Sequence, residues 1–386
     1  MRTRYVATTG DDANSGESEA LAWRTLAYAA TQAKPGDLIL VRAGTYSKDP
    51  FLLPVDGTAV NPIRLRGYAL APLDEPSLAG LDHTSPLDPT RMPLLDGGDR
   101  TKDVGIDLKK RKHVEVMNFQ VTGYRHGIDA YGSENIAMER LFVRDVGDRN
   151  ASYSGKGIVA YTSTRVRVED SLVVDAAAEG VTVEGTCNVI RRTRVASADA
   201  STDDASTDYY ITTNGTRNLV EECDVHRVGD LWHPGHGIGI KGCGSENVIR
   251  HNKVRHVKGE AYYVRHRAAT KNLFQFCDAD GEGVGFGFVA RDGASENVFE
   301  DGSFANGYAG IAFFDTTEDE DAILCVSDAQ LDTVVKLGGV KNSFHRIAIQ
   351  NATAGIQFHF YNQRGARSYG NLFDQLSVEA CANLFL

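Results

Sequence analysis

The sequence predicts an all-β chain folded as a right-handed parallel β-helix, one long solenoid of stacked coils. Three observations lead to this prediction. A Gly-apolar-x-apolar strand returns at intervals of about 23 to 30 residues, an asparagine or similar residue marks the turn after it, and no long helical period separates the copies. The strands alternate with period two, so successive side chains point into and out of the solenoid. Each coil is expected to contact only its neighbours.

The first strand of each coil and the turn after it are the two most regular elements. Copies of the strand lie at 127–131, 157–161, 180–184, 210–214, 237–241, 261–265, 287–291, 310–314 and 355–359. The turn asparagines are Asn135, Asn188, Asn218, Asn247, Asn272, Asn297, Asn342 and Asn371. One longer interval near residue 320 indicates an irregular coil. Regular coils are therefore expected over 113–386.

The N-terminal region differs from the repeats. Residues 23–30 have helical spacing, with Thr25 as the expected N-cap, and the turn 35–37 leads into the apolar strand 38–41. A helix at this point would cover the open end of the solenoid, as a capping unit must. We expect a cap and first strand within residues 1–50, and a single domain over 1–386.

Composition limits the function. The formal net charge of −11 disfavours a general nucleic-acid partner, and no apolar run is long enough to span a bilayer. The six cysteines include no CxxC pair, so a zinc or disulfide framework is not expected, and the thiols should behave as small buried hydrophobes. They are Cys187, Cys223, Cys243, Cys277, Cys325 and Cys381.

The outward residues that end the first strands form a column, about 4.8 Å from coil to coil. The column is aromatic at its ends and polar and cationic in its middle, from Glu184 to Arg291. In order it reads Tyr131, Tyr161, Glu184, Asn214, Lys241, Arg265, Arg291, Phe314 and His359. A cationic stretch on an acidic protein predicts an anionic ligand.

A polyuronate is the natural anionic polymer for a long groove, and lyases cleave it by β-elimination. This reaction needs a partner for the uronate carboxylate and a base that is partly unprotonated near neutral pH. Neighbouring positive charges lower the pKa of a lysine. The sequence therefore predicts Lys241 as the base, with Arg265 one coil further on.

Two resemblances support this prediction. Residues 5–16, 35–37 and 43–46 resemble the opening of secreted β-helix polysaccharide lyases, most closely the family 9 pectate lyases. Lys241 with the following 242–247, and 264–266 one coil later, is similar to the family of chondroitinase B and the alginate lyases. That resemblance implies that Lys241 is the base, that Arg265 is a proton donor or oxyanion partner, and that His266 contacts substrate. It also implies a secreted or periplasmic protein.

The remaining site predictions surround this pair. Candidate substrate contacts are Arg267, Arg291, His236, Asn214, Glu184, Tyr263 and Trp232. Calcium is a candidate cofactor because both families use it, but the acidic positions of the pectate lyases are reduced here to Asp208. The base lysine of the family 9 pectate lyases would fall at Gly239. The expected partner is an acidic polysaccharide, not a nucleic acid or a membrane.

Other functions remain open on the same fold. A glycoside hydrolase needs two carboxylates at a defined separation, for which Asp203, Asp204 and Asp208 are candidates. A uronate epimerase shares the proton abstraction with a lyase. A non-catalytic carbohydrate-binding solenoid would not require Lys241 together with Arg265.

Overall fold

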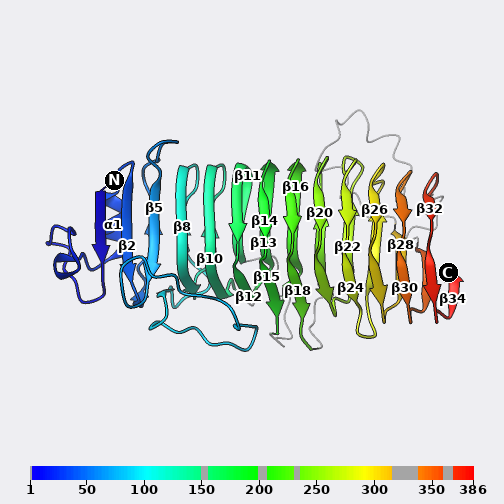
Figure 1. Ribbon diagram of the computed structural model, residues 1–386, viewed down its shortest axis with the longest axis horizontal. Coiled ribbons are helices and arrows are strands. Elements are labelled where there is room, and N and C mark those ends of the chain that lie inside the picture. Colours follow the sequence, from blue (N-terminus) through cyan, green and yellow to red (C-terminus); the bar gives the residue numbers. More distant parts are fainter. Residues whose placement is uncertain (1, 149–154, 199–206, 230–234, 315–337, 360–367) are drawn as a thin grey trace. The chain divides into compact units, whose positions relative to one another are not determined.

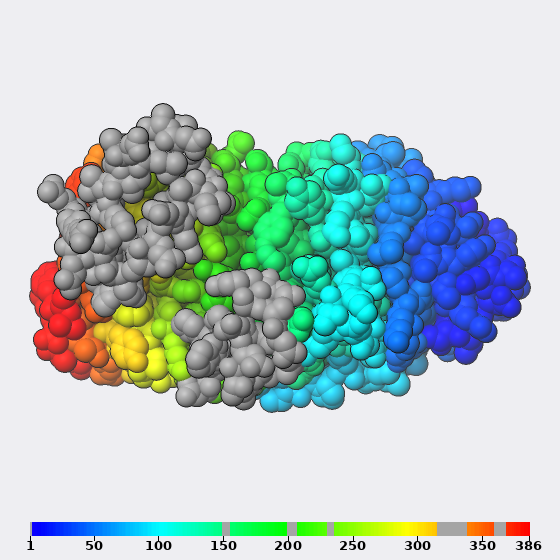
Figure 2. All heavy atoms as spheres, turned by 180° about the vertical axis from the view of Figure 1, so that it is seen from behind, coloured from blue at the N-terminus to red at the C-terminus, as the bar shows by residue number. Residues whose placement is uncertain are grey.

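The computed structural model describes residues 2–148, 155–198, 207–229, 235–314, 338–359 and 368–386. Within them the chain is a parallel β-helix with one α-helix, which confirms the predicted fold class. The chain forms two compact units. The first comprises Met1–Glu184, Asn188–Asp208 and Gly229–Trp232, and the second comprises Gly185–Cys187, Tyr209–Val228 and His233–Leu386. In both units successive coils follow one another in sequence order (Figure 1, Figure 2).

The first unit begins with β1 (Arg2–Val6), the 3-10 helix η1 (Glu19–Leu21) and helix α1 (Leu26–Gln32). The Thr25 side chain accepts from the Tyr28 N–H and caps α1, as the sequence predicted. The other strands are β2 (Asp37–Arg42), β3 (Gly44–Ser47), β4 (Phe51–Leu52), β5 (Ile63–Tyr68), β6 (Pro93–Asp96), β7 (Val104–Asp107), β8 (Lys112–Thr122), β9 (His126–Asp129), β10 (Glu134–Val146), β11 (Lys156–Glu169), β12 (Leu172–Ala176), β13 (Glu179–Thr186), β14 (Val189–Arg191) and β15 (Arg194–Ser197). All register pairs are parallel, and the long strands β8, β10 and β11 each pair in two sheets.

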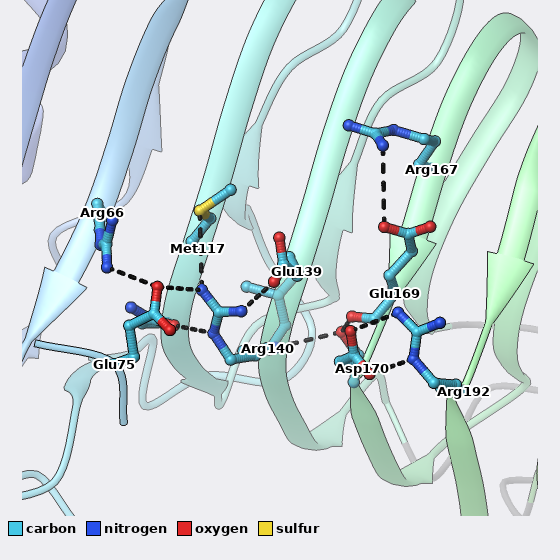
Figure 3. Close-up of polar contacts among 12 residues, drawn as sticks. Arg66, Glu75, Met117, Glu139, Arg140, Arg167, Glu169, Asp170 and Arg192 are labelled. Atoms are coloured by element: carbon cyan, nitrogen blue, oxygen red, sulfur yellow. Dashed lines mark hydrogen bonds and ion pairs between the residues drawn. The ribbon is translucent and has the colours of Figure 1, made fainter. Parts of the chain in front are cut away.

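A long connection between β5 and β6 packs on the outer surface of the first unit. Leu78 and Met92 are buried against Phe142 and Leu172. Ion pairs hold the start of the connection: Glu75 lies 3.1 Å from Arg66 and 3.8 Å from Arg140 (Figure 3). The connection therefore covers apolar side chains that point out of the coils.

The second unit repeats three strands per coil. Its first sheet, called sheet A below, contains β16 (Tyr209–Thr216), β19 (His236–Ile240), β22 (Glu260–Arg265), β25 (Phe286–Arg291), β28 (Ala309–Phe314), β31 (Ala354–His359) and β34 (Asn383–Phe385). The second sheet contains β17 (Leu219–Glu221), β20 (Val248–Arg250), β23 (Leu273–Gln275), β26 (Val298–Glu300), β29 (Ser343–His345) and β32 (Leu372–Asp374). The third contains β18 (Asp224–Arg227), β21 (Lys253–Arg255), β24 (Asp278–Asp280), β27 (Ser303–Ala305), β30 (Ala348–Gln350) and β33 (Ser377–Glu379).

The turn after sheet A is held by a ladder of buried asparagines. The Asn218 N–H donates to Asn247 Oδ1 at 2.8 Å, and the same bond repeats from Asn247 to Asn272 at 3.0 Å and from Asn272 to Asn297 at 3.0 Å. Inside the coils, aromatic rings stack from strand to strand, as Phe274 does on Phe299. Buried backbone groups need such partners, so this ladder fixes the register in which sheet A displays its outer side chains.

The cysteines depart in part from their prediction. Cys223 and Cys277 are buried free thiols, as expected, but Cys187 is exposed and Cys243 is disulfide-bonded. The prediction was wrong for Cys243 because sequence spacing does not show which turns of a solenoid approach each other. It was wrong for Cys187 because this residue lies in the exposed turn after β13. Cys325 lies outside the described residues.

Candidate functional site

The candidate site lies on the outer face of sheet A, in the second unit. Lys241 directly follows β19, and register pairs align Ile240 with Val264 and Arg265 with Arg291. Lys241, Arg265 and Arg291 therefore occupy equal positions on three consecutive coils. Phe314 continues this column and faces the Arg291 guanidinium at 5.6 Å from the ring centroid.

Tyr209, at the start of β16, connects the two predicted catalytic residues. The Lys241 ammonium nitrogen lies 4.1 Å from the centroid of the Tyr209 ring, a cation–π contact. Arg265 Nη1 donates to the Tyr209 hydroxyl at 3.2 Å. One tyrosine thus contacts both cations from the side of the preceding coil.

The two arginines are held by carboxylates. Asp292 Oδ2 accepts from Arg265 Nε at 2.8 Å and from Arg291 Nε at 3.1 Å. Arg291 Nη1 also donates to Glu260 Oε1 at 2.7 Å. The other oxygen of Glu260 bonds His236 Nδ1, and the His236 ring stacks on Tyr209 at 4.7 Å between centroids. These six side chains form a closed circuit that returns to Arg265 through the Tyr209 hydroxyl.

Burial makes this circuit rigid. The side chains of Glu260 and Asp292 are 3% and 0% exposed. Burial alone would raise the pKa of Glu260, but His236 and Arg291 lower it well below its usual range. Burial outweighs both arginines at Asp292 and raises the pKa of that carboxyl group, whose Oδ1 has no hydrogen-bond partner among the described residues. Arg265 and Arg291 thus share these two carboxylates.

His266 supports the turn that follows Lys241. It is buried, and its Nδ1 accepts from the Gly242 N–H at 2.9 Å. Burial, assisted by the charges of Arg265 and Lys241, lowers the pKa of His266 to about 3, so the ring is neutral near pH 7. The sequence predicted His266 as a substrate contact; in the structure this histidine is buried and bonded to the backbone of the turn after Lys241.

Tyr263 was predicted as a substrate contact, but the structure buries it. Its ring is only 1% exposed, because Tyr209 and His236 pack against it and its hydroxyl bonds Thr212 Oγ1 at 2.9 Å. A β-carbon on Gly239 would lie 2.4 Å from the Tyr263 ring. The position at which the family 9 resemblance places a lysine is therefore covered by a phenol.

The other predicted contacts are distributed more widely. Asn214 is half-buried beside Gly242, and Arg267 lies against Gly293. Glu184 and Asp208 belong to the first unit, where Glu184 is half-buried and Asp208 is buried. Trp232, Asp203 and Asp204 lie outside the described residues.

The described residues do not fit the calcium prediction. Among them, no group of three or more His, Cys, Asp or Glu side chains is arranged to hold a metal ion. Calcium prefers six to eight oxygen ligands, whereas Glu260 and Asp292, the carboxylates of this cluster, are bonded to arginines. No step below therefore involves a metal ion. The part of the chain that the structure describes also contains no helix long and apolar enough to cross a membrane.

Three members of the circuit were missing from the sequence prediction: Tyr209, Glu260 and Asp292. Tyr209, His236 and Glu260 each precede the first-strand pattern of their coil by one residue. Strict alternation would turn these positions inward, whereas the structure brings them against the outer cations. Asp292 directly follows Arg291, and this charge pair in the sequence was its only signal.

Comparisons with known proteins agree with the fold. The sequence matches the family described as "Right handed beta helix region" over residues 126–304. No curated protein matches the chain. A GH136 lacto-N-biosidase from Eubacterium ramulus superposes with a TM-score of 0.66 at 14% identity, covering 98% of this chain and 68% of that chain.

Two lyases are also similar in structure. A rhamnogalacturonan lyase superposes with a TM-score of 0.53 at 12% identity, covering 96% of this chain and 87% of that one. Pectate lyase Pel9A has a TM-score of 0.51 at 14% identity, covering 96% and 79%. These comparisons confirm the right-handed parallel β-helix and the predicted likeness to the β-helix lyases. At these identities the likeness is one of fold, and both lyases and glycoside hydrolases share it.

Proposed function

We propose that the protein is a polysaccharide lyase that cleaves an acidic, uronate-containing polysaccharide by β-elimination at Lys241 and Arg265. The fold supports the broader class, because the similar structures act on carbohydrates as lyases or hydrolases. One observation carries the finer proposal: Lys241 and Arg265 occupy equal positions on consecutive coils, and both contact Tyr209. An enzyme with such a substrate is expected to act outside the cytoplasm.

The residues divide the reaction between them. Arg265 remains protonated and offers its guanidinium to the uronate carboxylate, which stabilises the carbanion-like transition state. Lys241 accepts the proton from C5, the released electron pair forms the C4–C5 double bond, and the C4–O bond breaks. The departing oxygen takes a proton from water. Tyr209 holds both cations in place through its ring and its hydroxyl.

The hydrolase alternative finds less support in this cluster. Hydrolysis requires one carboxylic acid and one carboxylate with access to the glycosidic bond. Glu260 and Asp292, the two carboxylates of this cluster, are almost completely buried and bonded to arginines. An epimerase would use the same lysine, so only the product distinguishes it from a lyase.

The test uses polygalacturonate, alginate and chondroitin sulfate as substrates. The expected result is an increase in ultraviolet absorbance from the unsaturated uronate end with at least one polymer. Lys241→Ala should lower turnover by about 10²- to 10⁴-fold, the usual contribution of general acid–base catalysis, while polymer binding persists. Lys253→Ala is the matched control, because Lys253 is exposed on β21 in another sheet of the same unit.

Three results would contradict the proposal. New reducing ends without the absorbance change would indicate a hydrolase. A changed uronate composition without chain cleavage, read by NMR, would indicate an epimerase. Unchanged turnover in Lys241→Ala would remove Lys241 from the mechanism. Adding a chelator in the same assay tests the calcium prediction.

A further inference from the structure

A second polar cluster lies on the first unit, centred on Glu179 of β13. Three donors converge on one carboxylate oxygen of this residue. Glu179 Oε2 accepts from the Tyr161 hydroxyl at 2.9 Å and from Thr182 Oγ1 at 2.5 Å, and it lies 2.9 Å from Lys156 Nζ. Lys156 also contacts the Tyr161 ring, at 4.5 Å from its centroid. Glu179 is thus fixed in one orientation.

In this orientation the second carboxylate oxygen of Glu179 can still accept a hydrogen bond from a ligand. The Glu179 side chain is 18% exposed, and no contact within the described part of the chain engages its second oxygen, Oε1. His126 is half-buried, and its Nδ1 accepts from the Lys156 N–H at 3.2 Å. Burial, assisted by Arg125 and Lys156, lowers the pKa of His126 to about 4. The neutral ring therefore carries its proton on Nε2, a donor complementary to the Glu179 acceptor.

The coil that carries His126 also carries an exposed aromatic ring, two residues after β9. Tyr131 is 43% exposed, and Gly132 N donates to the Tyr161 carbonyl at 2.7 Å, which places Tyr131 and Tyr161 on neighbouring coils. An exposed phenol ring offers a flat apolar face with a polar tip. The C–H face of a pyranose ring fits such a surface, while its hydroxyls reach an acceptor and a donor at the side.

The charges around Glu179 balance. Lys156 pairs with Glu179, and Lys109 lies 3.2 Å from Asp107 and 3.4 Å from Asp129. Arg125 also faces His126. Three cations thus face three carboxylates, so the cluster has no surplus positive charge to attract an anion. This balance favours an uncharged ligand.

We propose that Tyr131, His126 and Glu179 form a binding site for a neutral hexopyranose unit of a polysaccharide. The sugar stacks on Tyr131 and places neighbouring hydroxyls between Glu179 Oε1 and His126 Nε2. Lys156, Tyr161 and Thr182 position the glutamate. The site does not depend on the activity proposed for Lys241, because its residues belong to the first unit.

Affinity gel electrophoresis of the full chain tests this proposal. The native gels contain galactan, xylan or mixed-linkage β-glucan as neutral probes. We expect at least one of them to retard the protein. Tyr131→Ala and Glu179→Gln should each weaken that binding by about tenfold, the loss expected for one good polar or stacking contact. Tyr369→Ala is the matched control, because that ring is 52% exposed and lies in the second unit.

Tyr131→Ala and Glu179→Gln are chosen so that a loss of binding is not caused by a loss of folding. Tyr131 is exposed, so its truncation leaves the core intact, and Glu179→Gln keeps the size of the side chain. Lys241→Ala should retain the neutral-polymer binding. The proposal is overturned if none of the three polymers retards the wild-type chain, if Tyr131→Ala and Glu179→Gln bind as the wild type does, or if Lys241→Ala abolishes the binding.

Discussion

The Lys241 cluster of the second unit and the Glu179 cluster of the first unit use the same kinds of side chain in different ways. In each, a lysine ammonium lies over a tyrosine ring, at 4.1 Å for Lys241 on Tyr209 and 4.5 Å for Lys156 on Tyr161. The tyrosine hydroxyl then differs in its role. Tyr209 accepts from Arg265, whereas Tyr161 accepts from Lys156 and donates to Glu179. The partner of the hydroxyl thus decides whether the cluster presents a cation or a carboxylate.

Burial separates the clusters further. Glu260 and Asp292 are nearly inaccessible and are used to orient arginines, while Glu179 remains 18% exposed with one oxygen available. A carboxylate that is buried against guanidinium groups contributes to shape and rigidity. A partly exposed carboxylate held by three donors can still bind a ligand. The comparison therefore predicts different consequences for equivalent substitutions.

The largest contrast in stability is expected for the two carboxylates. Asp292→Ala leaves Arg265 and Arg291 without their shared partner, and breaking a buried ion pair costs about 3–5 kcal/mol. Glu179→Ala removes a partly exposed carboxylate and should cost about 1 kcal/mol. Urea unfolding, with amide hydrogen exchange in β22 and β25, measures the difference.

Asp292→Asn is the matched control for this comparison. It retains an acceptor for the two Nε–H groups but loses the charge, so its loss of stability should fall between those of the wild type and Asp292→Ala. Equal unfolding midpoints for Asp292→Ala and Glu179→Ala would contradict the assignment of Asp292 as the buried support of the site.

The sequence predicted the solenoid well because its signals are local and repeated. The period-two strands, the turn asparagines and the Thr25 cap each act within one coil or between neighbouring coils. It also aligned Lys241 with Arg265, since equal positions on successive coils become neighbours. The residues that the sequence prediction missed are those whose side chains depart from the period-two alternation of the strands. Glu260 belongs to the outer network although it directly precedes the strand pattern, and the Tyr263 ring is covered by residues of two earlier coils.

The next comparison concerns two histidines with lowered pKa values, the buried His266 and the half-buried His126. The pKa of His266 is lowered to about 3 and that of His126 to about 4, from an ordinary value near 6.5. At pH values between the ordinary pKa and each lowered pKa, the histidine binds a proton in the unfolded chain but not in the folded chain. Stability is therefore full above about pH 6.5 and is lost as pH falls, by at most ~1.4 kcal/mol per pH unit for each histidine. The loss continues to about pH 3 for His266 and stops near pH 4 for His126.

Asparagine substitutions isolate these contributions. His266→Asn supplies an oxygen in place of Nδ1 for the Gly242 N–H, and asparagine tolerates the positive φ of 82° at this position. His126→Asn likewise supplies an oxygen acceptor in place of Nδ1 for the Lys156 N–H. Unfolding midpoints from about pH 7 to about pH 3.5 should decline less steeply in each variant than in the wild type. Parallel curves for wild type and His266→Asn would show that His266 titrates normally in the folded chain.

The smallest effects are expected from removal of the two tyrosine hydroxyls. Tyr209→Phe removes the hydroxyl that bonds Arg265, and Tyr161→Phe removes the hydroxyl that bonds both Lys156 and Glu179. Each lost hydrogen bond should cost about 0.5–1.5 kcal/mol, or roughly two- to tenfold. Tyr209→Phe should lower kcat/KM on the polyuronate without changing retardation by the neutral polymer. Tyr161→Phe should weaken that retardation without changing kcat/KM. Each variant is the control for the other, so a change of both readouts by either one would mean that the clusters do not act as separate sites.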